Sequence, residues 1–295
     1  NYLLFFYIRQ ALLNVGDASE IIDFICKHKD IRGDWTRHDL ERKAVAAWNR
    51  LKLHQRVGGV EAHFDPHRVV QLDEKNISNI EDISQFPLSG RVLLNTPEGS
   101  GKTNLILGNW LDEWKRINAN AAPRILYVCF RRAVLSQVSL EFGLDNYETV
   151  GKDEAERTGL SARERKERFC RASNNLAICN RSLRYLAPGG LKPEQYDIVI
   201  LDEIEALLDD IFLNIRLGDT EEEAWISRDK QFELLKRICR QANLVIGADA
   251  SASGLMSGWF MDLIAQEGRD EKVLIRNDAD YIADKEIRLQ PSLTQ

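Results

Sequence analysis

Short apolar runs recur along the chain from residue 90 onward, and amphipathic segments separate them. The runs lie at residues 92–94, 125–129, 176–179, 198–201, 244–247 and 273–275. They are continuous rather than alternating, which is typical of strands covered on both faces. Between them, apolar residues return at helical spacing, first at Leu107, Trp110, Leu111 and Trp114 and later at Phe232, Leu235, Ile238 and Ala242. Strands of this kind that alternate with helices predict an α/β fold around a mostly parallel central sheet.

Residues 1–85 follow a different pattern. All five histidines lie here, and helices are predicted near residues 17–26 and 36–51, where Thr36 is a candidate N-cap. Two β-like runs at 60–64 and 67–72 flank Asp65 and Pro66 and predict a hairpin. These features fit a small winged-helix module, and equally a helical connector with a loop. The predicted domains are therefore an N-terminal module at 1–85, an α/β domain at 86–280 and a linker at 281–295.

A glycine-containing turn follows the first predicted strand, and a helix is predicted to begin at Lys102. The nucleotide-binding residues predicted here are Thr96, Pro97, Glu98, Gly99, Ser100, Gly101, Lys102 and Thr103, with Thr96 at the place of the first glycine of the general P-loop pattern. Backbone N–H groups of such a turn and the positive end of the helix dipole bind phosphate. Lys102 is expected to reach the terminal phosphates and the Thr103 hydroxyl to hold Mg²⁺. The segment predicts ATP and Mg²⁺ as ligands.

An acidic pair ends the predicted strand at 198–201. Asp202 and Glu203 stand at its carboxyl end, the edge at which open α/β sheets bind ligands. Asp202 is expected to hold Mg²⁺, and Glu203 to orient or deprotonate the attacking water. Lys102, Asp202 and Glu203 are therefore the predicted catalytic residues.

These segments resemble the motifs of superfamily 2 DExx helicases. Residues 96–103 are similar to motif I, and residues 201–205, LDEIE, resemble motif II. Residues 125–134 are similar to motif Ia, residues 177–183 lie where a further DNA-contacting loop is expected, and residues 246–253 take the place of motif III. Within the superfamily, the likeness is to herpesvirus origin-binding proteins and to plasmid and phage replication helicases. It covers about residues 90–290.

The resemblance implies the first RecA-like motor domain of an ATP-dependent DNA helicase of DNA replication. It implies DNA contacts, to a single strand above all, through Arg131, Arg132, Asn180, Arg181 and Ser182. Asp249 and Ser251 would couple the state of ATP to the grip on DNA, although the segment departs from the usual Ser-Ala-Thr. Such helicases also need a second RecA-like domain with an arginine finger. We expect that domain in a longer parent protein, because the chain begins at Asn1 and only about forty residues follow Ser253.

Net charge and cysteine content restrict the kind of DNA contact and the cellular compartment that are expected. The net charge of −6 excludes a generally basic nucleic-acid coat, so DNA contacts must be local. Five cysteines without paired spacing indicate an intracellular, reducing compartment. No uncharged stretch approaches the roughly 18 apolar residues that cross a bilayer, so no membrane span is predicted.

Other interpretations stay open at this point. A P-loop kinase shares the first motif but normally lacks the acidic pair, and a non-catalytic module that binds DNA or a partner would keep only a relic P-loop. His63 and His67 stand four residues apart, as zinc ligands do, but Pro66 separates them. The tryptophans Trp110, Trp114, Trp225 and Trp259 could stack on bases, although helical spacing favours core packing.

Overall fold

The computed structural model describes residues 59–277, apart from 75, 120–121, 150–158, 191, 214–227, 251 and 253, together with residues 22, 23, 26, 36 and 37. The helices predicted near 17–26 and 36–51 fall almost wholly outside the described residues, as do Trp225, Ser251 and the predicted linker. No helix in the described ranges is both long and apolar enough to cross a membrane.

The described strands form one sheet of eight strands in the order β1-β8-β2-β7-β6-β3-β5-β4. The strands are β1 Val69–Leu72, β2 Gly90–Asn95, β3 Ile125–Cys129, β4 Asp145–Asn146, β5 Asn175–Cys179, β6 Ile198–Asp202, β7 Leu244–Asp249 and β8 Lys272–Asn277. Every pairing between them is parallel. The predicted parallel α/β fold is confirmed, and each of the six apolar runs is a strand.

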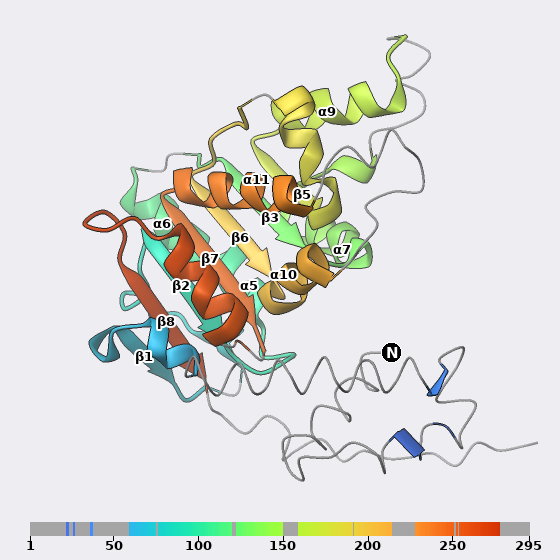
Figure 1. The fold of residues 1–295 in the computed structure, drawn as a ribbon. Helices are drawn as coiled ribbons and strands as arrows, with labels where there is room; N and C mark the ends of the chain where they lie inside the picture. Colours follow the sequence, from blue (N-terminus) through green and yellow to red (C-terminus); the bar gives the residue numbers. More distant parts are fainter. Residues whose placement is uncertain are drawn as a thin grey trace, which may run out of the picture.

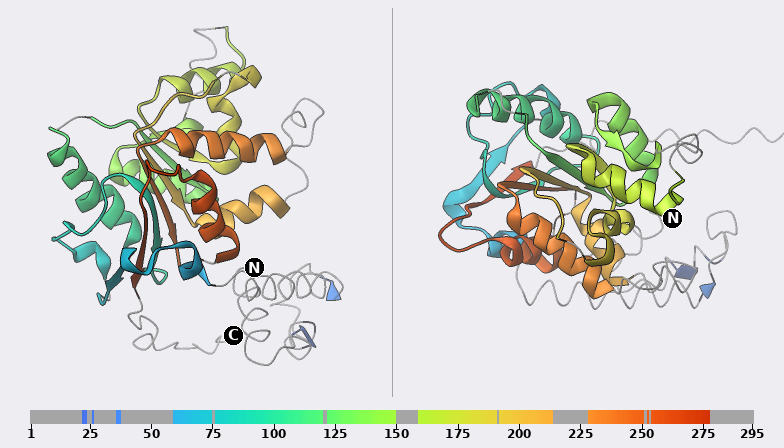
Figure 2. Two further views of the ribbon diagram at one scale, coloured as in Figure 1. Left: turned by 60° about the vertical axis from the view of Figure 1, so that its left-hand side comes forward. Right: turned by 90° about the horizontal axis from the view of Figure 1, so that it is seen from above.

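Helices cover both faces of the sheet, with α6 and α7 on one and α10, α11 and α12 on the other (Figures 1 and 2). The α-helices are α5 Lys102–Asn104, α6 Leu111–Ile117, α7 Arg132–Phe142, α9 Ala162–Ala172, α10 Ile204–Leu213, α11 Arg228–Gln241 and α12 Trp259–Ile264. The short 3-10 or π-helical segments are η1 Val60–His63, η2 Pro66–Arg68, η3 Ile77–Asn79, η4 Leu105–Trp110, η5 Tyr147–Thr149, η6 Asn180–Leu186, η7 Pro188–Gly190 and η8 Gly254–Gly258. Coverage on both faces accounts for the unbroken apolar strands.

Two tryptophans on the helical run after β2 belong to the core. Trp110 and Trp114 are buried, and their indole Nε1 atoms donate to the carbonyl oxygens of Pro87 and Leu88 over 3.0 and 3.1 Å. Trp259 is 37% exposed and stacks on the ring of Phe232. Core packing, rather than base stacking, is the use that the structure gives to Trp110 and Trp114.

The predicted hairpin at 60–72 is wrong. Residues 60–63 and 66–68 are the helical turns η1 and η2, and β1 pairs in parallel with β8 at the edge of the main sheet. The strand partner lies some 200 residues away in the chain, so a local pattern could not reveal it. Residues 59–74 thus pack with the α/β core, and Lys272 Nζ donates to the His63 carbonyl oxygen over 2.7 Å.

His63, one of the two candidate zinc ligands, has a different partner in the structure. His63 Nδ1 contacts the Asp262 carboxylate of α12, which also accepts from Lys272. Among the described residues, no group of three or more histidine, cysteine or acidic side chains is arranged to hold a metal ion. His63 therefore ties η1 to the core.

Candidate nucleotide-binding site

The turn after β2 is shaped by its two glycines. Gly99 and Gly101 have φ angles of +76° and +89°, in the left-handed region that favours glycine. A Cβ atom on Gly101 would lie 2.8 Å from Asn76 Oδ1 and from Ser78 Cβ, so η3 closes over the turn. The Ile77 N–H donates to the Ser100 carbonyl oxygen over 2.8 Å and fixes that contact.

Thr96 replaces the usual first glycine without opening the turn. Its side chain is buried, and its hydroxyl lies 3.0 Å from the Ser100 hydroxyl across the loop. Its backbone N–H donates to the Asp249 carbonyl oxygen over 3.0 Å, which joins the loop to the end of β7. The buried contact between the Thr96 and Ser100 hydroxyls thus accommodates threonine in place of glycine.

Lys102 is folded back into this loop. Its ammonium donates to the carbonyl oxygens of Thr96 and Pro97, each over 3.0 Å. Burial lowers the pKa of Lys102, and Asp249 and Asp202 are the first of the nearby carboxylates that oppose this shift. A phosphate oxygen in the loop would offer the ammonium a charged partner in place of neutral carbonyls, and charge-assisted hydrogen bonds are the stronger ones.

Asp202 and Glu203 lie opposite the loop, at the carboxyl end of β6. Asp202 Oδ2 accepts a 2.6 Å hydrogen bond from the hydroxyl of Tyr127, a buried residue of the neighbouring strand β3. The Thr103 hydroxyl also interacts with the Tyr127 hydroxyl. Burial raises the pKa of Asp202, and the Tyr127 hydrogen bond opposes that rise. Tyr127 therefore joins the two side chains predicted to hold Mg²⁺, and only the strand order reveals it.

Glu203 has an unusual backbone. Its φ angle is +51°, and outside glycine this left-handed region is sparsely populated and strained. The turn places the carboxylate on the wall of the cavity described below, and α10 begins one residue later. Burial raises the pKa of Glu203, while Arg131 lowers it.

Asp249 ends β7, the strand between β2 and β6, so it lies between the phosphate loop and the acidic pair. Its Oδ2 accepts from the Glu205 N–H over 2.9 Å, and Glu205 Oε1 accepts from the Ser257 N–H over 3.0 Å. This buried chain links β7, the first turn of α10 and η8. The sequence analysis gives Glu205 no role of its own within the motif II segment, and it cannot find Ser257, which takes part through its backbone N–H.

One cavity of about 320 Å³ unites these groups, with Gly99, Lys102, Thr103, Asp202, Glu203 and Asp249 among its lining residues. The Thr103 hydroxyl and the Asp202 carboxylate are oxygen donors of the kind that Mg²⁺ prefers. Within the described ranges, no group of three or more histidine, cysteine or acidic side chains is arranged to hold a metal ion by itself. The donor set therefore fits an ion that keeps water and phosphate oxygens in its shell, as Mg²⁺ does.

The predicted DNA contacts fall into two groups. Arg131 and Arg132 lie at the surface shortly after β3, and their side chains are 43% and 68% exposed. Arg131 Nε is 3.6 Å from Glu203 Oε2, and Arg132 Nε is 3.3 Å from Glu148 Oε1. Both arginines thus have carboxylate partners, but their exposure leaves them within reach of a phosphate.

The loop after β5 is different. Asn180 and Ser182 are buried, Asn180 Nδ2 donates to Asp210 Oδ2 over 2.8 Å, and the Ser182 hydroxyl donates to Tyr147. Arg181 makes two hydrogen bonds to the Asp210 carboxylate, over 2.6 and 2.9 Å. Asn180 and Ser182 therefore offer no side-chain donor to DNA in this conformation, because their donors are spent inside the fold.

Comparison with known proteins adds little to this geometry. No protein-family model matches the chain, and no curated protein does. Among solved structures, the chain is similar to a Sulfolobus solfataricus SWI2/SNF2 ATPase core in complex with dsDNA, with 13% identity and a TM-score of 0.39. The match covers 67% of this chain and 38% of that one. The likeness to herpesvirus origin-binding proteins finds no support here.

The fold class therefore rests on the topology itself. In the described residues, the phosphate-loop strand β2 and the acidic strand β6 flank β7 in an all-parallel sheet, which agrees with the RecA-like fold class that the motif resemblance implies.

Proposed function

We propose that this chain is the ATP-binding and ATP-hydrolysing motor domain of a nucleic-acid translocase of the superfamily 2 type. The observation that carries the proposal is the single cavity whose wall combines Lys102 and Thr103 with Asp202 and Glu203. A phosphate-binding loop facing an acidic pair is what nucleotide hydrolysis requires.

Each residue has a role in this proposal. The loop N–H groups and Lys102 bind the phosphates, and Thr103 and Asp202 would hold Mg²⁺, which would neutralise phosphate charge. Glu203 orients the attacking water and accepts its proton. Because Glu203 lines the cavity beside Asp202, hydrolysis fits the site better than transfer to another acceptor, as in a P-loop kinase.

The finer assignment is a DNA helicase of replication that tracks along a single strand. Its support is the motif resemblance and the position of Arg131 and Arg132 at the same sheet edge as the cavity. A second RecA-like domain would supply the arginine finger, commonly worth a 10³–10⁵-fold rate increase in P-loop enzymes. If the P-loop is a relic, the alternative is a non-catalytic module that binds DNA or a partner.

Calorimetry with Mg²⁺–ATP tests the nucleotide site. Lys102→Ala should weaken binding by about tenfold to a hundredfold, since a hydrogen bond to a charged group contributes roughly 1.5–3 kcal/mol. Lys115→Ala is the matched control, because Lys115 is exposed on α6 and pairs only locally with Asp112. Equal affinities for the Lys102→Ala variant and the wild type would refute the proposed site.

A further inference from the structure

Arg131 lies where the nucleotide site meets the predicted DNA surface. It is the N-cap of α7, two residues after the end of β3, and β3 pairs with β6. The carboxyl ends of these two strands are therefore adjacent. This adjacency brings Arg131 Nε within 3.6 Å of Glu203 Oε2, although 72 residues separate the two in the chain.

The carboxylate of Glu203 is incompletely satisfied. Its residue has a left-handed φ angle of +51°, which is sparsely populated outside glycine. The Oε2 atom is shielded from solvent and accepts no hydrogen bond from the described residues, although the side chain as a whole is 35% exposed. Arg131 supplies charge to this oxygen at ion-pair distance rather than through a hydrogen bond.

The ion pair between Arg131 and Glu203 is weak enough for another anion to replace Glu203. A separation of 3.6 Å exceeds the roughly 2.7–3.2 Å of a hydrogen bond, and 43% of the Arg131 side chain is exposed. Partly exposed pairs of this kind are weak, so a second anion can compete for the guanidinium. Phosphate is a strong competitor because a guanidinium binds it through two hydrogen bonds at once.

We propose that Arg131 is a positioning residue for Glu203 and that a nucleic-acid phosphate competes with Glu203 for it. This inference rests on the proposed function. Without nucleic acid, Arg131 holds the carboxylate toward the β3 side. When a backbone phosphate takes the guanidinium, Glu203 loses its counter-charge and turns to the water in the cavity. Nucleic-acid binding thereby frees the group that activates water.

Arg132 provides the internal contrast. It is adjacent in sequence and more exposed, but its partner Glu148 belongs to η5 and not to the nucleotide cavity. Arg132 can contribute to nucleic-acid affinity without any link to Glu203. Comparing variants of the two arginines therefore distinguishes competition for the Arg131 guanidinium from general attraction between a basic surface and phosphate.

A double-mutant cycle on nucleic-acid affinity tests the competition without relying on turnover. The probe is a fluorescent oligo(dT) in low salt without nucleotide, and its anisotropy gives the dissociation constant for the full chain. Glu203→Gln should tighten binding about two- to fivefold, the range that exposed ion pairs contribute. The gain should vanish in an Arg131→Gln background and persist in an Arg132→Gln background.

Glu98→Gln controls for the loss of one negative charge, because Glu98 lines the same cavity. Any gain it gives should persist with Arg131→Gln. The inference is overturned if Glu203→Gln leaves the affinity unchanged, if its gain survives in the Arg131→Gln background, or if the wild type does not bind the oligonucleotide. Mant-ATP binding is measured in parallel. If ATP binding is normal and the effects of Glu203→Gln and Arg131→Gln simply add, only this inference is refuted. If the chain does not bind ATP, the proposed function is refuted.

Discussion

At the scale of single residues, the candidate nucleotide site includes Tyr127, to which the sequence analysis assigns no role at this site. Tyr127 is buried on β3, and its hydroxyl reaches Asp202 over 2.6 Å and also interacts with Thr103. A buried carboxylate needs such a donor, since an unpaired buried charge is costly. The phenol therefore fixes the orientation of the groups that would hold Mg²⁺.

Replacing this tyrosine tests that role. Tyr127→Phe keeps the ring and removes the donor, so the Mg²⁺ dependence of nucleotide binding should shift to higher Mg²⁺. The expected shift is about two- to tenfold, because a net hydrogen bond contributes roughly 0.5–1.5 kcal/mol. Titration of Mg²⁺ against bound fluorescent ATP measures it.

Two controls accompany the variant. Nucleotide affinity in excess EDTA should equal that of the wild type, and thermal unfolding should show that the fold is retained. An unchanged Mg²⁺ midpoint would mean that Tyr127 only fills the core.

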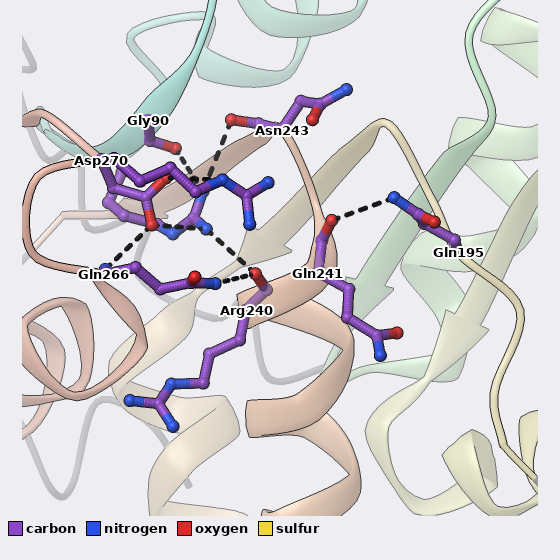
Figure 3. Close-up of polar contacts among 9 residues, drawn as sticks. Gly90, Gln195, Arg240, Gln241, Asn243, Gln266 and Asp270 are labelled. Carbon is purple, nitrogen blue, oxygen red and sulfur yellow. Dashed lines mark hydrogen bonds and ion pairs between the residues drawn. The ribbon is translucent and has the colours of Figure 1, made fainter.

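At the scale of elements, a buried ion pair joins the amino-terminal ends of β2 and β8, the strand ends opposite the site. Arg91 of β2 and Asp270, just before β8, are almost fully buried, with 2.9 Å between Nη2 and Oδ2. Arg91 Nη1 also donates to the Gly90 carbonyl oxygen over 2.9 Å, and the Gln266 N–H donates to Asp270 Oδ2 (Figure 3). The network joins β2 to the turn between α12 and β8.

Breaking one half of this pair should destabilise the whole domain. Asp270→Ala leaves a buried guanidinium without its counter-charge, and the expected loss is about 3–5 kcal/mol in the free energy of unfolding. Urea unfolding followed by circular dichroism measures it. Glu113→Ala removes the partner of the exposed Arg116 and should leave the midpoint unchanged. Equal midpoints for Asp270→Ala and the wild type would contradict this view of the network.

The same scale shows what the sequence could predict. Buried parallel strands are continuous apolar runs, so β2, β3, β5, β6, β7 and β8 were all found. Edge strands lack this mark: β1 was assigned to a hairpin, and the two-residue β4 was missed. The contacts of Tyr127 with Asp202 and of Arg131 with Glu203 depend on β3 lying beside β6. Spacing along the chain carries no information about that neighbour.

At the scale of the whole molecule, the site is the meeting point of strands that are distant in sequence. The carboxyl ends of β2, β7 and β6 bring the phosphate loop, Asp249 and the acidic pair to one edge, with Arg131 beside them. Because the net charge is −6, the proposed function places the attraction of nucleic acid on this local surface rather than on the molecule as a whole. Binding should accordingly fall with rising salt, because phosphate contacts release counterions.

The measurement that tests the central claim most directly is single-turnover hydrolysis of radiolabelled ATP by the wild type and by Glu203→Gln, at protein concentrations that saturate binding. Both proteins should bind ATP, since Glu203 is assigned to the water and not to the phosphates. The variant should hydrolyse it about 10²–10⁴-fold more slowly, the usual contribution of a general base. Equal single-turnover rates in the two proteins would contradict the account.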